Sequence, residues 1–311
     1  MPKKSPNNSN NEENEKILPW QRPKRKEEEP RVLELVRRIM EDPSYRLAEE
    51  DPEFIKSPRA RGIRLQLDYL KVELKLQELG VEHTIVVFGS ARILEKKTAL
   101  KTLEAVQKRL KRDGESARLL RKLAIAEKMV EKSIYYDDAR EFGRLVGKSG
   151  RGPEDCRVIL MTGGGPGIME AANRGAYDVG AKSIGLNIQL PHEQYPNPYI
   201  TPGLCFQFHY FAMRKLHFLN RARALVVYPG GFGTLDELFE TLTLVQTHKQ
   251  EPMPIVMVGR RYWDRLIDFE FLVEEGSIAA RDLDIFTLAD SAQEAWDIIL
   301  NWHMNRKSPL F

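Results

Sequence analysis

The chain of 311 residues is 42% apolar and has a net charge of only +3, from 48 basic and 45 acidic residues. This length and apolar content can bury a sizeable core in one large α/β domain or in two smaller ones. The near balance of charge does not favour a nucleic-acid-binding protein. We expect a cytoplasmic protein with no signal peptide and no membrane span, because the start lacks an apolar segment and the two cysteines are far apart.

The first 80 residues differ in composition from the rest. Residues 1–30 are polar, rich in Asn and interrupted by Pro, which is typical of a disordered tail. From 31 onward, apolar residues recur at intervals of three and four, which predicts helices over 31–40 and 61–79. We expect these helices to form an N-terminal extension, 31–80, that packs on the main domain, 81–311.

Short apolar runs in the main domain end at glycine or proline and alternate with helical patterns. Continuous apolar runs are typical of parallel strands that are buried on both faces. They predict a doubly wound, Rossmann-like α/β domain with helices on both faces of a parallel sheet. The runs are TIVVFGS (84–90), RVILMTGGG (157–165), SIGLNIQLP (183–191), ALVVYPGG (224–231) and PIVMVG (254–259).

A long helical pattern at 94–150 interrupts this alternation. Residues 96–132 are rich in Lys and Arg, but acidic residues are interleaved and helical spacing places Leu and Ala on one side. This pattern favours a solvated helical hairpin inside an insertion, with an RNA-binding surface as the alternative.

Three glycine-rich turns follow predicted strands: FGSAR (88–92), TGGGPGIMEAA (162–172) and PGGFGT (229–234). In a doubly wound sheet, ligands bind outside the carboxyl ends of the strands, so we expect the three turns to converge on one ligand. Glycine lets the main chain approach a ligand closely, and the first N–H groups of a helix bind anions. The expected ligand therefore carries a phosphate.

Other nucleotide and metal chemistries lack their motifs. Gly163, Gly165 and Gly167 approximate a dinucleotide fingerprint but do not match it, and no acid ends the next apolar run. No glycine loop continues into Lys and then Ser or Thr, as a Walker A motif requires. The six histidines never reach a metal-binding spacing, so we expect neither a metal nor an organic cofactor.

Met-Arg-Lys at 213–215, followed by PGGFGTLDE at 229–237, resembles the signature of the Lonely Guy family. In that family a helix that carries Met-Arg-Lys precedes a PGGxGTxxE loop. The turns FGSAR and TGGGPGIMEAA also resemble family motifs. The resemblance covers 83–93 and 155–265. It implies a phosphoribohydrolase that splits a nucleoside 5′-monophosphate into a free base and ribose 5-phosphate. Many such sequences have been labelled lysine decarboxylases, but nothing here supports a pyridoxal phosphate site.

The resemblance also implies roles for individual residues. Arg214 and Glu237 match the catalytic pair. Met169, Lys215 and Glu240 are further candidate substrate contacts. The phosphate- and nucleotide-binding residues would be Ser90, Gly163, Gly164, Gly165, Gly230, Gly231, Gly233 and Thr234.

The resemblance bears on assembly and substrate as well. Family members are usually dimers or larger, which implies a homodimer or a higher oligomer. The stretch SIGLNIQLPHEQYPNPY resembles the larger bacterial members. That favours ordinary purine or pyrimidine monophosphates such as AMP over a plant-hormone (cytokinin) monophosphate.

The chemistry of an N-glycosidic bond explains why an acid would follow a phosphate loop. Its cleavage builds positive charge on the ribose, so the carboxylate of Glu237 can stabilise that charge and orient or deprotonate the attacking water. Arg214 would offset the negative charge around the phosphate and the sugar hydroxyls.

Four simpler interpretations remain from the residues alone. Thr234 and Glu237 also match a capping box, and Ser90 could cap a helix that starts near Arg92. Arg214 could be a surface cation, and Glu240 could lie on a solvated face. The alternative function is a nucleotide-binding sensor without turnover.

Overall fold

The computed structural model describes residues 31–150, 152, 155–190, 195–307 and 310. The chain divides into two compact units, Met1–Arg64 and Leu65–Phe311. The tail expected at 1–30 lies outside the described residues. The domain limits of 31–80 and 81–311 stay a prediction.

The first unit consists of short helices joined by Pro-containing turns. Its elements are α1 (Val32–Glu41), η2 (Pro43–Tyr45), η3 (Ala48–Glu50), α2 (Pro52–Lys56) and η4 (Pro58–Ala60). The Asp51 side chain starts α2 by accepting hydrogen bonds from the N–H groups of Glu53 and Phe54, each at 3.0 Å. Both predicted helices are confirmed, because α3 (Arg61–Glu78) follows and continues into the second unit.

The second unit contains a parallel sheet of seven strands in the order β4-β3-β2-β1-β5-β6-β7. All five predicted strands are present, and two more lie at the edges of the sheet. The sheet places β1 beside β2 on one side and beside β5 on the other, so the strand order reverses between β1 and β5. The strands are β1 (His83–Phe88), β2 (Val158–Thr162), β3 (Ser183–Ile188), β4 (Cys205–Phe208), β5 (Ala222–Val227), β6 (Ile255–Val258) and β7 (Phe286–Ala289).

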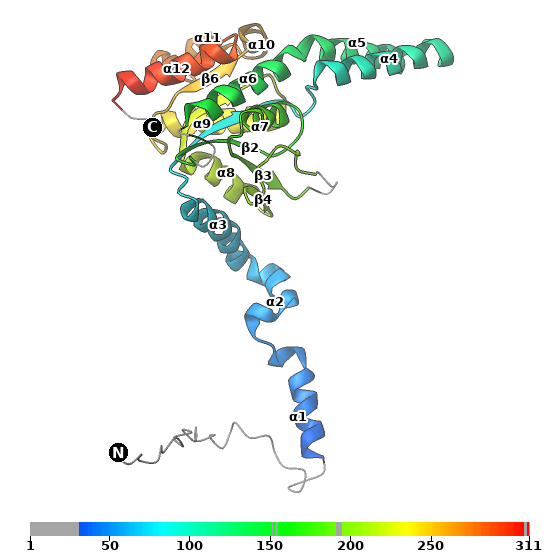
Figure 1. The fold of residues 1–311 in the computed structure, drawn as a ribbon, viewed down its shortest axis with the longest axis vertical. Coiled ribbons are helices and arrows are strands. Elements are labelled where there is room, and N and C mark those ends of the chain that lie inside the picture. The colour runs from blue at the N-terminus through cyan, green and yellow to red at the C-terminus, as the bar shows by residue number, and fades with distance from the viewer. Residues whose placement is uncertain (1–30, 151, 153–154, 191–194, 308–309, 311) are drawn as a thin grey trace, which may run out of the picture. The chain divides into compact units, whose positions relative to one another are not determined.

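Helices cover both faces of the sheet (Figure 1). One face packs against α3, α8 (Phe211–Asn220), α9 (Phe232–Gln246) and α10 (Arg260–Leu266). The other packs against α6 (Ile134–Ser149), α7 (Ile168–Asp178) and α12 (Ala292–Asn305). The doubly wound Rossmann-like fold is therefore confirmed. The C-terminal half also contains α11 (Phe269–Glu274) and η5 (Ala280–Ile285).

The insertion forms three helices. The hairpin predicted within 96–132 is confirmed as α4 (Lys96–Asp113) packed on α5 (Ala117–Lys132). Its third helix, α6, belongs to the core, because Phe142 and Val146 are buried against the sheet. Gly143 and Gly175 let α6 and α7 approach so closely that a Cβ at either position would overlap a carbonyl oxygen of the other helix.

No helix in the described ranges is long and apolar enough to cross a membrane.

Candidate active site

A cavity of about 660 Å³ opens where β1 and β5 end, at the reversal of strand order. Turns after both strands form its walls, together with side chains from α7, α8, α9 and α10. The lining residues are Phe88, Gly89, Ser90, Ala91, Arg92, Met169, Phe211, Arg214, Gly230, Gly231, Phe232, Gly233, Thr234, Leu235, Asp236, Glu237, Tyr262 and Leu266.

The turn after β5 leads directly into α9, whose N-cap is Gly231. Gly230 must be glycine, because a Cβ there would overlap the side chain of Thr234. The backbone N–H groups of Phe232 and Gly233 have no backbone acceptor among the described residues. They open α9 beside the cavity, which makes this helix start suited to bind an anion.

The capping-box interpretation of Thr234 and Glu237 is wrong. It requires Thr234 to be the N-cap, but α9 already begins at Phe232, and no side chain caps it. Thr234 instead donates its backbone N–H to the carbonyl of Gly231, at 3.0 Å. Glu237 therefore lies inside the helix, beyond the reach of an N-cap backbone.

The Glu237 carboxyl group lines the cavity although its side chain is only 7% exposed. Burial raises its pKa from 4.5 to about 7, against the opposing charges of Lys215 and Arg214. The acids Glu240 and Asp236 add to the rise. None of the described residues is seen to donate a hydrogen bond to this carboxyl group. It is free to contact a ligand and to change protonation near neutral pH.

Arg214 on α8 is not a surface cation. Its Nε donates to the carbonyl of Leu186 at 2.7 Å, and its Nη2 donates to the carbonyl of Gly163 at 3.4 Å. The guanidinium lies 4.9 Å from the ring centre of Phe218. Burial lowers its pKa, and the charge of Glu237 raises it. These contacts hold the cation at the cavity wall.

The turn after β2 lies behind Arg214, and Gly163, Gly164 and Gly165 are not among the described residues that line the cavity. A Cβ at Gly163 would contact the Arg214 guanidinium and the sulfur of Met169. Gly164 has a φ of +70° and would overlap Asn187 if it had a Cβ. The geometry suits these glycines to positioning Arg214 and Met169.

A buried polar network shapes this turn. Asn173 on α7 accepts hydrogen bonds from Thr162 at 2.7 Å and from Asn197 at 3.0 Å. Asn197 also donates to the carbonyl of Gly165 at 3.1 Å, and the N–H of Gly164 donates to Thr162 at 3.0 Å. No sequence pattern marks Asn173, Asn197 or Thr162 as part of the site, because single Asn and Thr side chains carry no spacing signal.

Ser90 connects the three turns. Its N–H donates to the carbonyl of Pro229 at 3.0 Å, and its carbonyl accepts from Ile168 at 3.1 Å. Its hydroxyl accepts a hydrogen bond from the N–H of Arg92 at 3.1 Å. This bond closes a turn, because the next helix starts only at Lys96. The helix expected near Arg92 as a simpler interpretation is therefore wrong.

Lys215 and Glu240 are not among the described residues that line the cavity, and they pair with each other at 2.8 Å. Lys215 also contacts Asp236 at 2.9 Å. Their influence on the site is electrostatic, through the pKa of Glu237.

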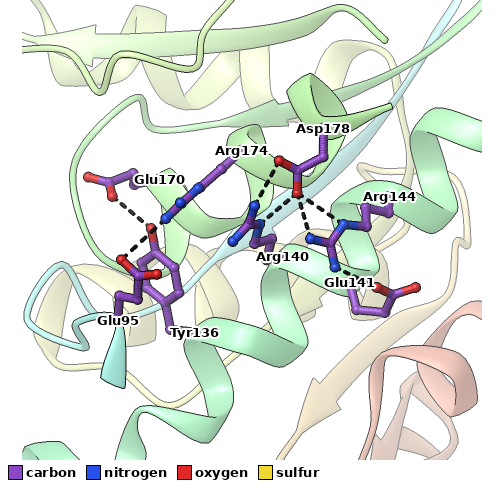
Figure 2. A network of polar contacts seen from close by, with 8 residues as sticks. All are labelled: Glu95, Tyr136, Arg140, Glu141, Arg144, Glu170, Arg174 and Asp178. Carbon is purple, nitrogen blue, oxygen red and sulfur yellow. Dashed lines mark hydrogen bonds and ion pairs between the residues drawn. The ribbon is translucent and has the colours of Figure 1, made fainter. Parts of the chain in front are cut away.

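Contacts between α6 and α7 support the helix that carries Met169 (Figure 2). Arg140 and Arg144 both reach Asp178, at 2.6 and 2.7 Å. The Tyr136 hydroxyl donates to Glu170 at 2.7 Å. The insertion thereby braces one wall of the cavity.

Tyr262, Phe211 and Leu266 also line the cavity, although no sequence motif includes them. Tyr262 donates its hydroxyl to the carbonyl of Gly230 at 2.5 Å, which holds the turn after β5. Only the packing of α8 and α10 beside that turn brings these residues to the site.

Within the described ranges, no group of three or more His, Cys, Asp or Glu side chains is placed to hold a metal ion.

This fold and site define a class: Rossmann-like α/β proteins with a glycine-rich turn that opens a helix at the strand-order reversal. A family model described as "Possible lysine decarboxylase" matches residues 169–299. A cytokinin riboside 5′-monophosphate phosphoribohydrolase of Arabidopsis thaliana is 30% identical over 168 residues, 52% of this chain and 74% of that protein. The chain belongs to the Lonely Guy family.

Two further comparisons show the extent of the likeness. A probable enzyme of the same name from Oryza sativa subsp. japonica is 31% identical over 139 residues, 44% of this chain and 59% of that protein. The match thus spans less than two thirds of this relative. The molybdenum cofactor binding protein of Rippkaea orientalis is similar with a TM-score of 0.39 and 14% identity, over 70% of this chain and 94% of that one.

Proposed function

We propose that this protein hydrolyses the N-glycosidic bond of a nucleoside 5′-monophosphate to release the free base and ribose 5-phosphate. The observation that carries the proposal is Glu237, a buried carboxyl group with a pKa of about 7 in the wall of a cavity that also contains an open helix start. The Arabidopsis thaliana relative is a cytokinin riboside 5′-monophosphate phosphoribohydrolase, and the Oryza sativa relative is described as a probable one.

In this proposal, each end of the substrate contacts a different group of the protein. The phosphate would bind the N–H groups at the start of α9. The ribose would lie toward Glu237, which is about one turn further along the same helix. Ionised Glu237 would accept a proton from water as the water oxygen bonds to the anomeric carbon. The glycosidic electron pair leaves with the base nitrogen, which takes up a proton from solvent, while Glu237 releases its proton to solvent and is ionised again. The carboxylate also stabilises the positive charge that develops on the ribose.

Arg214 would contact the ribose 5-phosphate part of the substrate. Two of its nitrogens are held by the carbonyls of Leu186 and Gly163, so its orientation is set before the substrate arrives. A planar cation held in this way suits the sugar hydroxyls and phosphate oxygens. The remaining candidate contacts, Ser90 and Met169, line the same cavity.

We take AMP as the first substrate to test, with GMP, CMP and cytokinin riboside 5′-monophosphate as the comparison set. Release of adenine from AMP, followed by chromatography, supports the enzyme. Tight AMP binding without adenine release would instead support the nucleotide sensor.

The specificity constant for AMP is expected to rise about tenfold between pH 6 and pH 8. Since the pKa of Glu237 is raised to about 7, the ionised fraction grows from about a tenth to about nine tenths over that interval. Lys215→Met removes an opposing cation and should move the midpoint to higher pH. A midpoint that stays in place in this variant would belong to another group, such as the phosphate of AMP.

A homodimer or larger oligomer is also part of the proposal. Exposed apolar side chains on the second unit, among them Leu120, Ile125 and Ile134, offer surface for self-association. Light scattering at micromolar concentration should give at least twice the chain mass of 35.9 kDa. A mass near one chain would contradict it. The cytoplasmic location stays a prediction.

A further inference from the structure

A second cavity, of about 450 Å³, lies beside the candidate active site. The end of α5, the start of α6 and the short helix α10 form it. Tyr262 and Leu266 line both cavities, so the two are neighbours across one wall.

Positive charge dominates the second cavity. Its charged side chains are Lys128, Glu131, Lys132, Arg261 and Arg265. The carboxylate of Glu131 is engaged by Lys128 at 2.6 Å. The other three cations show no ion pair with any residue in the described part of the chain. Like charges around one concavity repel one another, and a bound anion relieves that repulsion.

We propose that this cationic pocket, defined by Lys132, Arg261 and Arg265, binds a polyphosphate chain, either free or as part of a nucleoside triphosphate. Arginine offers a planar fork to phosphate oxygens, and lysine adds a point charge. Three cations around one cavity exceed what a single phosphate group needs. An RNA strand would also need aromatic side chains on which its bases stack, so RNA binding is tested as a separate outcome below.

The cationic pocket is coupled to the candidate active site through Tyr262. The Lys132 ammonium lies over the Tyr262 ring, 5.0 Å from its centre. The hydroxyl of the same ring holds the carbonyl of Gly230 at 2.5 Å. A polyanion that draws Lys132 toward itself therefore acts on Tyr262, which holds the turn after β5 at Gly230. Because two anions in adjacent cavities also repel each other, polyphosphate should weaken AMP binding. This coupling rests on the proposed function, whereas polyphosphate binding does not.

The test is calorimetry on the full chain with sodium tripolyphosphate, ATP and a short single-stranded RNA. Tripolyphosphate should bind, and the double variant Arg261→Ala/Arg265→Ala should raise its Kd at least about tenfold, since each lost contact is charge-assisted. Both side chains are exposed, so the fold should be retained. The matched control is Arg260→Ala, on the same helix but outside the cavity and paired with Asp290 at 3.6 Å. It should leave the Kd unchanged.

Comparing the three ligands shows whether the pocket prefers free polyphosphate, a nucleoside triphosphate or RNA. Equal Kd values for ATP and tripolyphosphate indicate free polyphosphate, and tighter ATP binding indicates a nucleoside triphosphate. Absence of saturable binding at millimolar tripolyphosphate overturns the proposal, as does the same loss in Arg260→Ala. Tighter binding of RNA that the double variant abolishes would assign the pocket to nucleic acid instead.

A second titration tests the coupling. Saturating tripolyphosphate should raise the Kd for AMP at least about fivefold in the parent protein and not in the double variant. An unchanged AMP affinity would refute the coupling. If AMP fails to bind at all while tripolyphosphate binds, the proposed function fails and the cationic pocket stands.

Discussion

Glu237→Gln is expected to lower the rate of base release from AMP by about a hundredfold or more, because it removes a group that acts both as general base and as electrostatic stabiliser. The amide has the same shape, so AMP should still bind. The measurement is adenine release under saturating AMP, with AMP affinity determined separately. The exposed acid Asp264→Asn is the control, since it removes a charge from α10 at a position that does not line the cavity. Its rate should change by no more than a few fold.

The same variant should be more stable than the parent above neutral pH. The folded-state pKa of Glu237 is raised to about 7 from 4.5, so the unfolded chain ionises first as pH rises. The resulting penalty is absent below pH 4.5, grows up to pH 7 and is complete above it, at about 3 kcal/mol. Gln carries no such penalty, so thermal unfolding at pH 8 should occur at a higher temperature. A Glu237→Gln protein that is no more stable and cleaves AMP at the parent rate would refute the catalytic assignment.

Adenosine is expected to be cleaved at least about a thousandfold less efficiently than AMP. Without a 5′-phosphate the ligand loses the N–H groups of Phe232 and Gly233 and the neighbouring Ser90 as partners. Each lost charge-assisted hydrogen bond costs about 1.5 to 3 kcal/mol, and two such bonds already approach that factor. The comparison is made on kcat/KM for base release.

Adenosine 3′-monophosphate is the control for this comparison. It carries the same charge as AMP at the wrong end of the ribose, so it should be as poor a substrate as adenosine. Equal efficiency for adenosine and AMP would mean that the start of α9 does not hold a phosphate.

The strands predicted from sequence were those whose apolar runs are continuous. Such runs are buried on both faces of the sheet, so the pattern is independent of neighbouring elements. The two missed strands lie at the edges. In β4 (Cys205–Phe208), exposed and buried residues alternate, and β7 (Phe286–Ala289) is only partly buried. Short runs of this kind depend on pairing with a neighbour to become strands.

The candidate site also contains residues that the sequence indicates and residues that only the tertiary structure brings in. Arg214, Glu237 and the glycines after β5 belong to the recognised motif, and all of them line the cavity. Lys215 and Glu240, which are close to them in the sequence, do not line it. The capping-box alternative would have placed the N-cap of α9 at Thr234, three residues beyond the observed N-cap, Gly231. In the structure α9 begins at Phe232, and Gly230 lies so close to Thr234 that a Cβ there would overlap its side chain.

The sequence by itself determined the doubly wound class and the position of the glycine turns, because buried strands and close backbone approaches each require particular residue types at consecutive positions. Tertiary structure alone decided the rest. It placed the Gly163 turn behind Arg214, put Tyr262 against Gly230, and buried Glu237 deeply enough to bring its pKa to about 7. These features depend on distances between elements that are remote in the chain, and no local spacing of residues encodes them.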